Sequence, residues 1–220
     1  MSAANSPTPR PLRIAYTMQN TGVDLTADIG QTILIRNTVL GLARLGHAVD
    51  IFTLNGRSVL KVADINQAQH TEPVPLGLTD NRLFKLVESG MRRLQGMVRL
   101  PYLALFDTWR FRDAGQHVFG QYDLCHEYAG LFSIGTALSC RRLGKPYVIT
   151  VDADLTLETA VLGRPLRGLR HRWATYTAAL NYRLAAHIIC VSEATRQILI
   201  HKWGVAPEKV TVVANGVDVA

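Results

Sequence analysis

Cysteine is scarce in this sequence. The 220 residues include only three, Cys125, Cys140 and Cys190, and these lie far apart without the spacing of metal ligands. The pattern excludes a disulfide framework and predicts three small, buried side chains in a reducing compartment.

Long apolar runs are also missing, since no stretch reaches the roughly 18 residues of a membrane-spanning helix. Residues 1–11 lack both the charged start and the apolar core of a signal peptide, and we interpret them as a flexible tail. Hydrophobic residues make up 48% and charged residues 19%, the balance of a globular protein. We therefore expect a cytoplasmic location, with peripheral docking at the inner face of the membrane.

Acidic charge is in deficit, and the formal net charge of +7 suits anionic partners. The basic residues form no recognisable nucleic-acid recognition motif, so we expect no nucleic-acid binding. A Gly-x-Gly-x-x-Gly fingerprint is absent after the first apolar run. That absence argues against a Rossmann-type epimerase or dehydrogenase, which an NAD titration would detect.

What the chain does contain is a series of short Val/Ile/Leu-rich runs alternating with helical stretches. This order predicts an α/β fold, a Rossmann-like parallel sheet with helices on both faces. A further strand in 72–78 would be confined to an edge by its prolines. The expected strands are Leu12–Met18, Ala48–Leu54, Tyr122–His126, Tyr147–Val151, His187–Val191 and Val210–Val213.

Helix boundaries are marked by capping residues and glycines. Asp28 and Ser192 are expected N-caps, with helices ending before Gly46 and Gly204. A third helix is expected from about Leu131 to Leu143, and two more within Arg82–Met97 and Arg99–Phe119.

Candidate site residues follow the first, third and fourth of these strands. Gly30 and Gln31 stand where a helix begins after the first strand, a position that suits a phosphate, although a tight turn would explain the glycine equally well. His126 and Glu127 end one strand, and Asp152 and Asp154 follow the next. The carboxylates suit a base or sugar-hydroxyl contacts.

Each of these side chains also has a structural interpretation. The histidine would be a satisfied residue at the sheet edge, and the aspartates would be helix caps or turn residues. Arg196, in the helix that Ser192 caps, faces either an anionic ligand or solvent.

Together these stretches resemble glycosyltransferase family 4, the retaining GT-B enzymes. The residues that carry the resemblance are Asp28-Ile-Gly-Gln31, Leu45-Gly-His47, Tyr122-Asp-Leu-Cys-His126, Lys145-Pro-Tyr-Val-Ile-Thr150, His187-Ile-Ile-Cys-Val-Ser-Glu193 and Val212-Val-Ala-Asn-Gly-Val-Asp218. A histidine that the family usually has after the Pro-…-Thr strand, where it contacts the donor sugar, is absent. Asp152 stands at or next to its place.

The resemblance implies that 12–214 form the N-terminal, acceptor-side domain and that 215–220 begin a crossover to a nucleotide-sugar-binding domain. The intact enzyme would move a hexose from a nucleotide sugar to a glycan or lipid-linked acceptor, with retention and without a metal or other cofactor. Gly30 and Gln31 would form the donor phosphate loop. Asp152 and His126 would be catalytic, and Glu127, Asp154 and Arg196 would line the sugar and acceptor pocket.

We expect this chain alone to be inactive, because half of the cleft would be missing. The alternative is a non-catalytic acceptor- or membrane-binding subunit that pairs with a separate catalytic half. Arg82–Phe119 mixes basic and aromatic residues, and Gly163–Arg183 contains five arginines and no acid. An anionic membrane surface is therefore a candidate partner, unless the aromatic residues are core and the arginines a solvated face.

Overall fold

The computed structural model describes residues 10–19, 24–27, 30–98 and 103–214. An eight-stranded sheet has the order β4-β3-β2-β1-β5-β6-β7-β8. In the run β2-β1-β5-β6-β7-β8 each strand is parallel to its neighbour. At the other edge, β3 is antiparallel to both β2 and β4. The strands are β1 (Arg13–Met18), β2 (Ala48–Asn55), β3 (Ser58–Val62), β4 (Glu72–Pro73), β5 (Leu124–Tyr128), β6 (Tyr147–Val151), β7 (His187–Cys190) and β8 (Val210–Val212).

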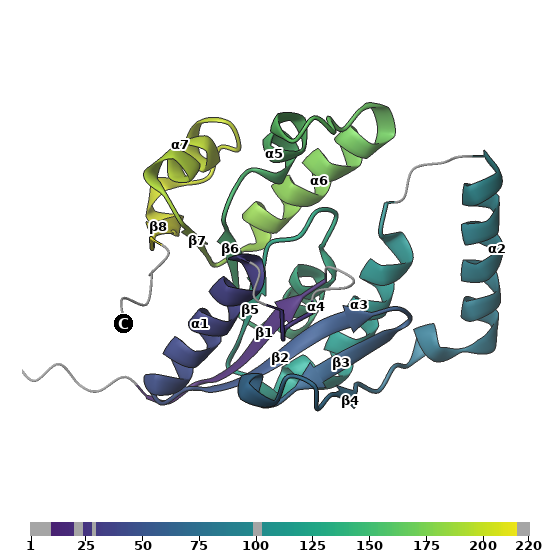
Figure 1. The fold of residues 1–220 in the computed structure, drawn as a ribbon, viewed down its shortest axis with the longest axis horizontal. Helices are drawn as coiled ribbons and strands as arrows, with labels where there is room; N and C mark the ends of the chain where they lie inside the picture. The colour runs from purple at the N-terminus through teal and green to yellow at the C-terminus, as the bar shows by residue number, and fades with distance from the viewer. Residues whose placement is uncertain (1–9, 20–23, 28–29, 99–102, 215–220) are drawn as a thin grey trace, which may run out of the picture.

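Helices cover both faces of this sheet (Figure 1). They are α1 (Gly30–Arg44), α2 (Arg82–Val98), α3 (Leu105–Val118), α4 (Gly135–Leu143), α5 (Leu155–Val161), α6 (Gly168–Leu184) and α7 (Glu193–His201), with short 3-10 turns at Ile65–Gln67, Leu78–Asp80, Phe119–Gln121 and Pro207–Lys209. The α/β, Rossmann-like fold expected from the sequence is confirmed. None of the described helices is both long and apolar enough to span a bilayer.

Two apolar clusters lie on opposite faces of the sheet because successive strand residues point to opposite sides. Ile35 and Val39 of α1 pack with Tyr16 and Met18 of β1 on one face. The larger cluster, on the other face, joins the sheet to α3, α4, α6 and α7. It includes Cys125, Cys140 and Cys190, all buried with free thiols, as predicted.

Several local signals produced the expected boundaries. The Ser192 hydroxyl accepts a hydrogen bond from the Thr195 amide and so caps α7. Gly46, Gly144 and Gly204 follow their helices with positive φ. The expected helix start at Leu131 is wrong, because Phe132 is left-handed and a Gly130–Ser133 turn precedes α4.

Gly135 starts α4 where no side chain would fit. A Cβ there would lie 2.8 Å from the Thr108 carbonyl oxygen of α3 and 2.8 Å from the Gln19 side-chain oxygen. The two helices therefore approach closely along one face of the sheet.

The segment between β2 and α4 departs most from expectation. The antiparallel hairpin of β2 and β3 in this segment was not predicted. Further along the chain, between β6 and β7, α5 and α6 were not predicted either. The expected strand in 72–78 is reduced to β4, at the sheet edge. Helix α3 begins at Leu105, six residues after the expected start. The expected tail and crossover lie almost wholly outside the described residues, as does the proposed cap Asp28.

Candidate active site at the carboxyl edge of the sheet

The strand order reverses direction at β1. The chain runs from β1 outward to β2 on one side and later returns to place β5 on the other side. In open α/β sheets ligands bind beyond the carboxyl ends of the strands at such a switch point. The end of β1, the start of α1 and the end of β5 therefore define where a ligand is expected.

A groove of about 500 Å³ lies beside α1 at this point, and both Gly30 and His126 line it. Gly30 is the first residue of α1, so backbone N–H groups without helical partners lie next to it. A Cβ at Gly30 would meet nothing within 4 Å, so the fold itself does not require glycine there. A helix N-terminus in a groove is a site for an anion.

His126 is buried on the α1 face of the sheet. Its ring lies 4.9 Å from the Tyr16 ring, and its Nε2 is 2.7 Å from the Thr150 hydroxyl oxygen, a hydrogen bond. Burial lowers the pKa of His126 to about 4, so the imidazole is neutral at physiological pH. A neutral ring has one donor and one acceptor nitrogen and can orient a hydroxyl group.

Asp152 lies on the same face, just after β6. Its Oδ2 accepts a hydrogen bond from the Tyr128 hydroxyl. Its Oδ1 is buried and has no donor among the described residues. Burial raises the pKa of Asp152, opposed by the Tyr128 hydrogen bond. An acceptor without a protein donor at a ligand-binding edge is available to a ligand hydroxyl.

Glu127 does not join His126, because the two are consecutive strand residues and point to opposite faces. The Glu127 carboxylate is fully buried and accepts hydrogen bonds from Tyr147 (2.6 Å) and Gln19 (3.0 Å). Burial raises its pKa, although these hydrogen bonds oppose the shift. The Gln19 side-chain oxygen accepts from the Gly135 amide, so Glu127 ties the end of β1 to the start of α4.

Asp154 serves as the N-cap of α5. Its Oδ1 accepts from the Thr156 amide (2.9 Å), while its Oδ2 accepts from Lys202 (2.7 Å) and the Trp203 indole (2.9 Å). Burial would raise the pKa of Asp154, but the hydrogen bonds from Lys202, Thr156 and Trp203 lower it. The two aspartates after β6 therefore have separate surroundings.

The two remaining predicted residues lie nearby without lining the groove. Gln31 is the half-buried second residue of α1. Arg196, on α7, donates to Glu193 at 3.2 Å and is half-exposed near the carboxyl end of β7.

Two further polar groups were missed from the sequence, Thr150 and Tyr128. Each lies two residues from a predicted site residue: Thr150 of β6 precedes Asp152, which follows that strand, and Tyr128 follows His126 within β5. The two-residue period of a strand could have found them, since it places each on the same face as its predicted neighbour.

Within the described part of the chain, no group of three histidine, cysteine or acidic side chains is arranged to hold a metal ion. Two polar groups at the carboxyl edge, the N-terminus of α1 and the neutral His126 imidazole, line one groove, while the Asp152 carboxylate lies on the same face of the sheet without lining that groove. Such a set can bind an anionic group and orient hydroxyl groups.

The chain was compared with known families, curated proteins and solved structures. A solved structure of HepE from Anabaena, in complex with UDP and glucose, is 16% identical and has a TM-score of 0.49, covering 94% of this chain and 45% of that one. The chain thus spans less than half the length of that protein. No curated protein matches the sequence. The family described as Glycosyltransferase Family 4 matches over residues 30–220. The chain belongs to glycosyltransferase family 4.

Proposed function

We propose that this chain is the acceptor-side half of an enzyme that moves a hexose from a nucleotide sugar to a glycan or lipid-linked acceptor, with retention of configuration. The observation that carries the proposal is the single groove at the switch point, lined by both the N-terminus of α1 and His126. A nucleotide sugar has an anionic diphosphate next to a hydroxyl-rich ring, which are the two chemistries that these groups recognise.

The N-terminus of α1 faces the diphosphate in this proposal. Gly30 lets the backbone approach the phosphates, and Gln31 completes the loop. Charge develops on the departing diphosphate in the transition state, and oriented amide groups with a helix dipole stabilise it. A closed cleft between this half and a nucleotide-binding half then holds the two substrates in reacting geometry.

His126 and Asp152 bind the transferred sugar. The neutral imidazole contacts one hydroxyl, and the Oδ1 of Asp152 accepts from another. Glu127 acts indirectly, because its carboxylate holds Gln19 at the end of β1. Asp154 holds α5 against the end of α7. Arg196 belongs on the acceptor side of the cleft.

An anionic membrane surface is part of the proposal for a lipid-linked acceptor. Helix α6 begins with exposed Arg170 and Arg172 and exposed Leu169, and exposed Val161 and Leu162 end α5. Apolar side chains that enter the interface and arginines that meet anionic headgroups are the two contributions to such docking.

Gly30→Val in the intact two-domain protein tests the proposal. The side chain has open space within this chain, so the fold is expected to tolerate it. Loss of the close phosphate approach is expected to lower kcat/KM for the nucleotide sugar by about 100-fold, the order seen when one transition-state donor is removed.

Gly41→Val is the matched control, since Gly41 lies in the same helix with equally open space and does not line the groove. If both variants lower kcat/KM alike, or if Gly30→Val changes only the Tm, the phosphate role is rejected. The chain of 220 residues by itself is expected to turn over no nucleotide sugar.

A further inference from the structure

Helix α2 has the inverse of the usual burial pattern. A surface helix normally buries its apolar stripe and exposes its charges. In α2, all of which the structure describes, the buried side chain is Glu88, while Leu83 is 67% exposed, Leu86 70% and Met97 76%. The apolar side of this helix is therefore largely unpacked.

Charged groups attach α2 to the rest of the molecule. The Glu88 carboxylate is fully buried and lies 2.6 Å from the guanidinium of buried Arg110 in α3. Arg92 pairs with Glu88 at 2.9 Å and with Asp107 at 3.0 Å, and Arg57 of the β2–β3 turn lies 3.4 Å from Glu88. This ion cluster is one point at which α2 is held against α3.

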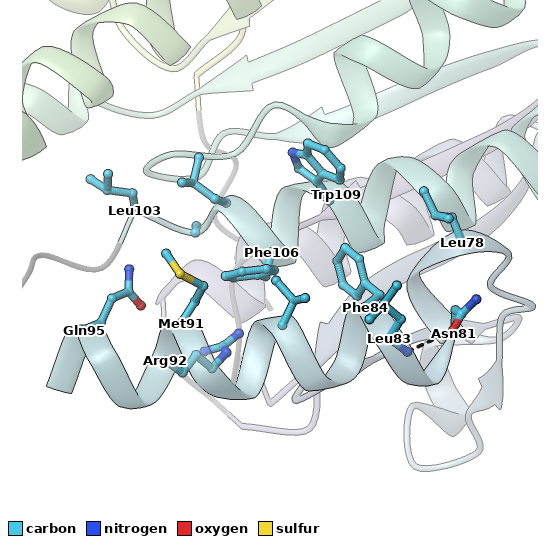
Figure 2. Close-up of a pocket in the computed structure, with 13 residues that line it drawn as sticks. Leu78, Asn81, Leu83, Phe84, Met91, Arg92, Gln95, Leu103, Phe106 and Trp109 are labelled. Atoms are coloured by element: carbon cyan, nitrogen blue, oxygen red, sulfur yellow. Dashed lines mark hydrogen bonds between the residues drawn. The ribbon is translucent and has the colours of Figure 1, made fainter. Parts of the chain in front are cut away.

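Beside that point the two helices enclose an apolar groove of about 610 Å³ (Figure 2). Its walls include Phe84 and Met91 from α2 and Phe106 and Trp109 from α3, and the Phe84 and Trp109 rings stack at 6.5 Å. Figure 2 shows Gln95 and Arg92 toward one end of the groove and Asn81 at the other. The volume lies within the range of about 300–1,000 Å³ of small-molecule sites.

One end of the groove lies against the part of the fold that carries the candidate active site. The indole nitrogen of Trp173 in α6 donates to the carbonyl oxygen of Leu103, which lines the groove. Figure 1 shows the C-terminal end of α2 and the start of α3 on the same side of the molecule as α5 and α6. A chain lying in the groove would leave it toward the carboxyl edge of the sheet.

The charge of α2 indicates which kind of molecule would bind to its exposed apolar side. Helix α2 carries four basic residues and one acid, the buried Glu88. Lys85 pairs with Asp80, and Arg92 pairs with Glu88 and Asp107. Arg82 and Arg93 are exposed and give the helix surface an excess of positive charge. A second copy of the chain, itself at +7, would bring like charges together. An amphiphile with an apolar chain and a phosphate headgroup complements both the groove and its basic surroundings.

We propose that the groove between α2 and α3 binds the apolar chain of a phosphate-bearing, lipid-linked acceptor. The inference rests on the proposed sugar transfer and names its acceptor class. The chain lies between Phe84 and Trp109, and the phosphate and the group to be glycosylated extend past Leu103 toward the carboxyl edge.

Tryptophan quenching by dibromostearyl phosphate, used as monomer below its micelle concentration, tests the groove directly. Bromine quenches an indole only on contact, and the chain has three tryptophans, of which only Trp109 lines the groove. In a Trp173→Phe/Trp203→Phe variant, the fluorescence of Trp109 is expected to fall saturably. In a Trp109→Phe/Trp173→Phe variant, the fluorescence of Trp203, which lies beyond α7, is expected to stay constant.

Two matched carboxylate substitutions locate the binding. Met91→Asp places a charge in the groove and is expected to weaken probe binding at least about tenfold. Leu86→Asp changes a more exposed residue of the same helix that does not line the groove, and binding is expected to stay within about twofold. Circular dichroism melting verifies that both variants fold.

Equal quenching of Trp109 and Trp203, unchanged binding by Met91→Asp, or a dimer in sedimentation that Met91→Asp dissolves would each overturn the inference. Failure of sugar transfer is a separate result, since quenching reports binding without turnover. Transfer to a lipid-linked acceptor without quenching of Trp109 would reject the groove as the binding site for the apolar chain, while the proposed sugar transfer would stand.

Discussion

His126 is a buried histidine whose neutral state is part of the role proposed for it. Its pKa is about 4 in the folded protein and about 6.5 in an unfolded chain. Between these values the unfolded state takes up a proton that the folded state does not. The free energy of unfolding is therefore expected to fall as the pH decreases from about 6.5 to 4, by up to about 3 kcal/mol.

Urea denaturation of the wild type and of His126→Gln across this pH range measures that contribution. The glutamine keeps an amide near Thr150 but does not titrate, so it should remove this part of the pH dependence. Glu127 and Asp152 have raised pKa values, so their contributions to the free energy of unfolding increase as the pH falls. Both proteins contain these two residues, so their contributions cancel when the two pH profiles are subtracted. Parallel pH profiles for the two proteins would show that His126 is not buried neutral.

The two aspartates after β6 are expected to respond oppositely to amidation. Asp152→Asn removes a half-buried charge whose pKa burial raises, so stability at neutral pH should be unchanged or rise. The kcat/KM of the intact enzyme should fall by about 100-fold. Asp154→Asn weakens the hydrogen bonds to Lys202 and Trp203 and should cost about 2 kcal/mol. Thermal melting and steady-state kinetics of both variants measure these effects. Full activity of Asp152→Asn would show that Asp152 does not contribute to sugar transfer.

Residue types and their spacing predicted which strands end at the site, but not which side chains meet there. The consecutive pair His126 and Glu127 was grouped because it is polar, whereas the two-residue period of a strand separates it. The role of Asp154 depends on Lys202 and Trp203, almost fifty residues away. Partners at that sequence distance leave no local pattern.

At the scale of elements, the ion cluster under α2 gives a direct prediction. Glu88→Gln removes the nearer of the two carboxylates that face buried Arg110, leaving Asp107 at 3.6 Å, and is expected to cost about 3 kcal/mol. Amide hydrogen exchange should show α2 losing protection before the sheet does. Burial alone would raise the pKa of Glu88, but Arg110 and Arg92 lower it. This contribution is therefore lost as the pH falls below the ordinary range for glutamate.

Glu158→Gln is the control for this change, because it neutralises an exposed carboxylate in α5 and should change stability by no more than about 0.5 kcal/mol. If Glu88→Gln is as stable as this control and α2 keeps its protection, the cluster does not attach the helix.

The sequence predicted α2 as a helix from the spacing of Leu83, Val87 and Met91, and its bounds are confirmed to within a residue at either end. That spacing could not reveal that the apolar side stays exposed, since burial depends on what packs against it. The β2–β3 hairpin was missed because the turn at Gly56 joins two short runs that look like one strand and a loop. Helix α6 was missed because arginines and aromatics obscure its apolar spacing.

For the whole molecule, anionic vesicles are the test of membrane docking. Binding is expected to vesicles that contain phosphatidylserine, to weaken at high salt, and to fall more than about tenfold in Arg93→Glu/Arg172→Glu, since each arginine contributes about 1 kcal/mol. Arg141→Glu/Arg142→Glu makes the same change in charge at the C-terminal end of α4 and should bind as the wild type. A protein that stays in the supernatant at low salt would direct attention to a soluble acceptor.

The two outermost strands of the sheet bear on how copies of this protein can associate. β4 has two residues, one of them Pro73, and β8 has three. Sheets join edge to edge through rows of free backbone N–H and C=O groups, and strands this short offer few of them. Fibre-like addition of strand to strand is thus blocked at both ends. If the purified protein aggregates, we expect the exposed apolar side chains of α2 to be the cause. A mild detergent, rather than a change in salt concentration, should then disperse the aggregates.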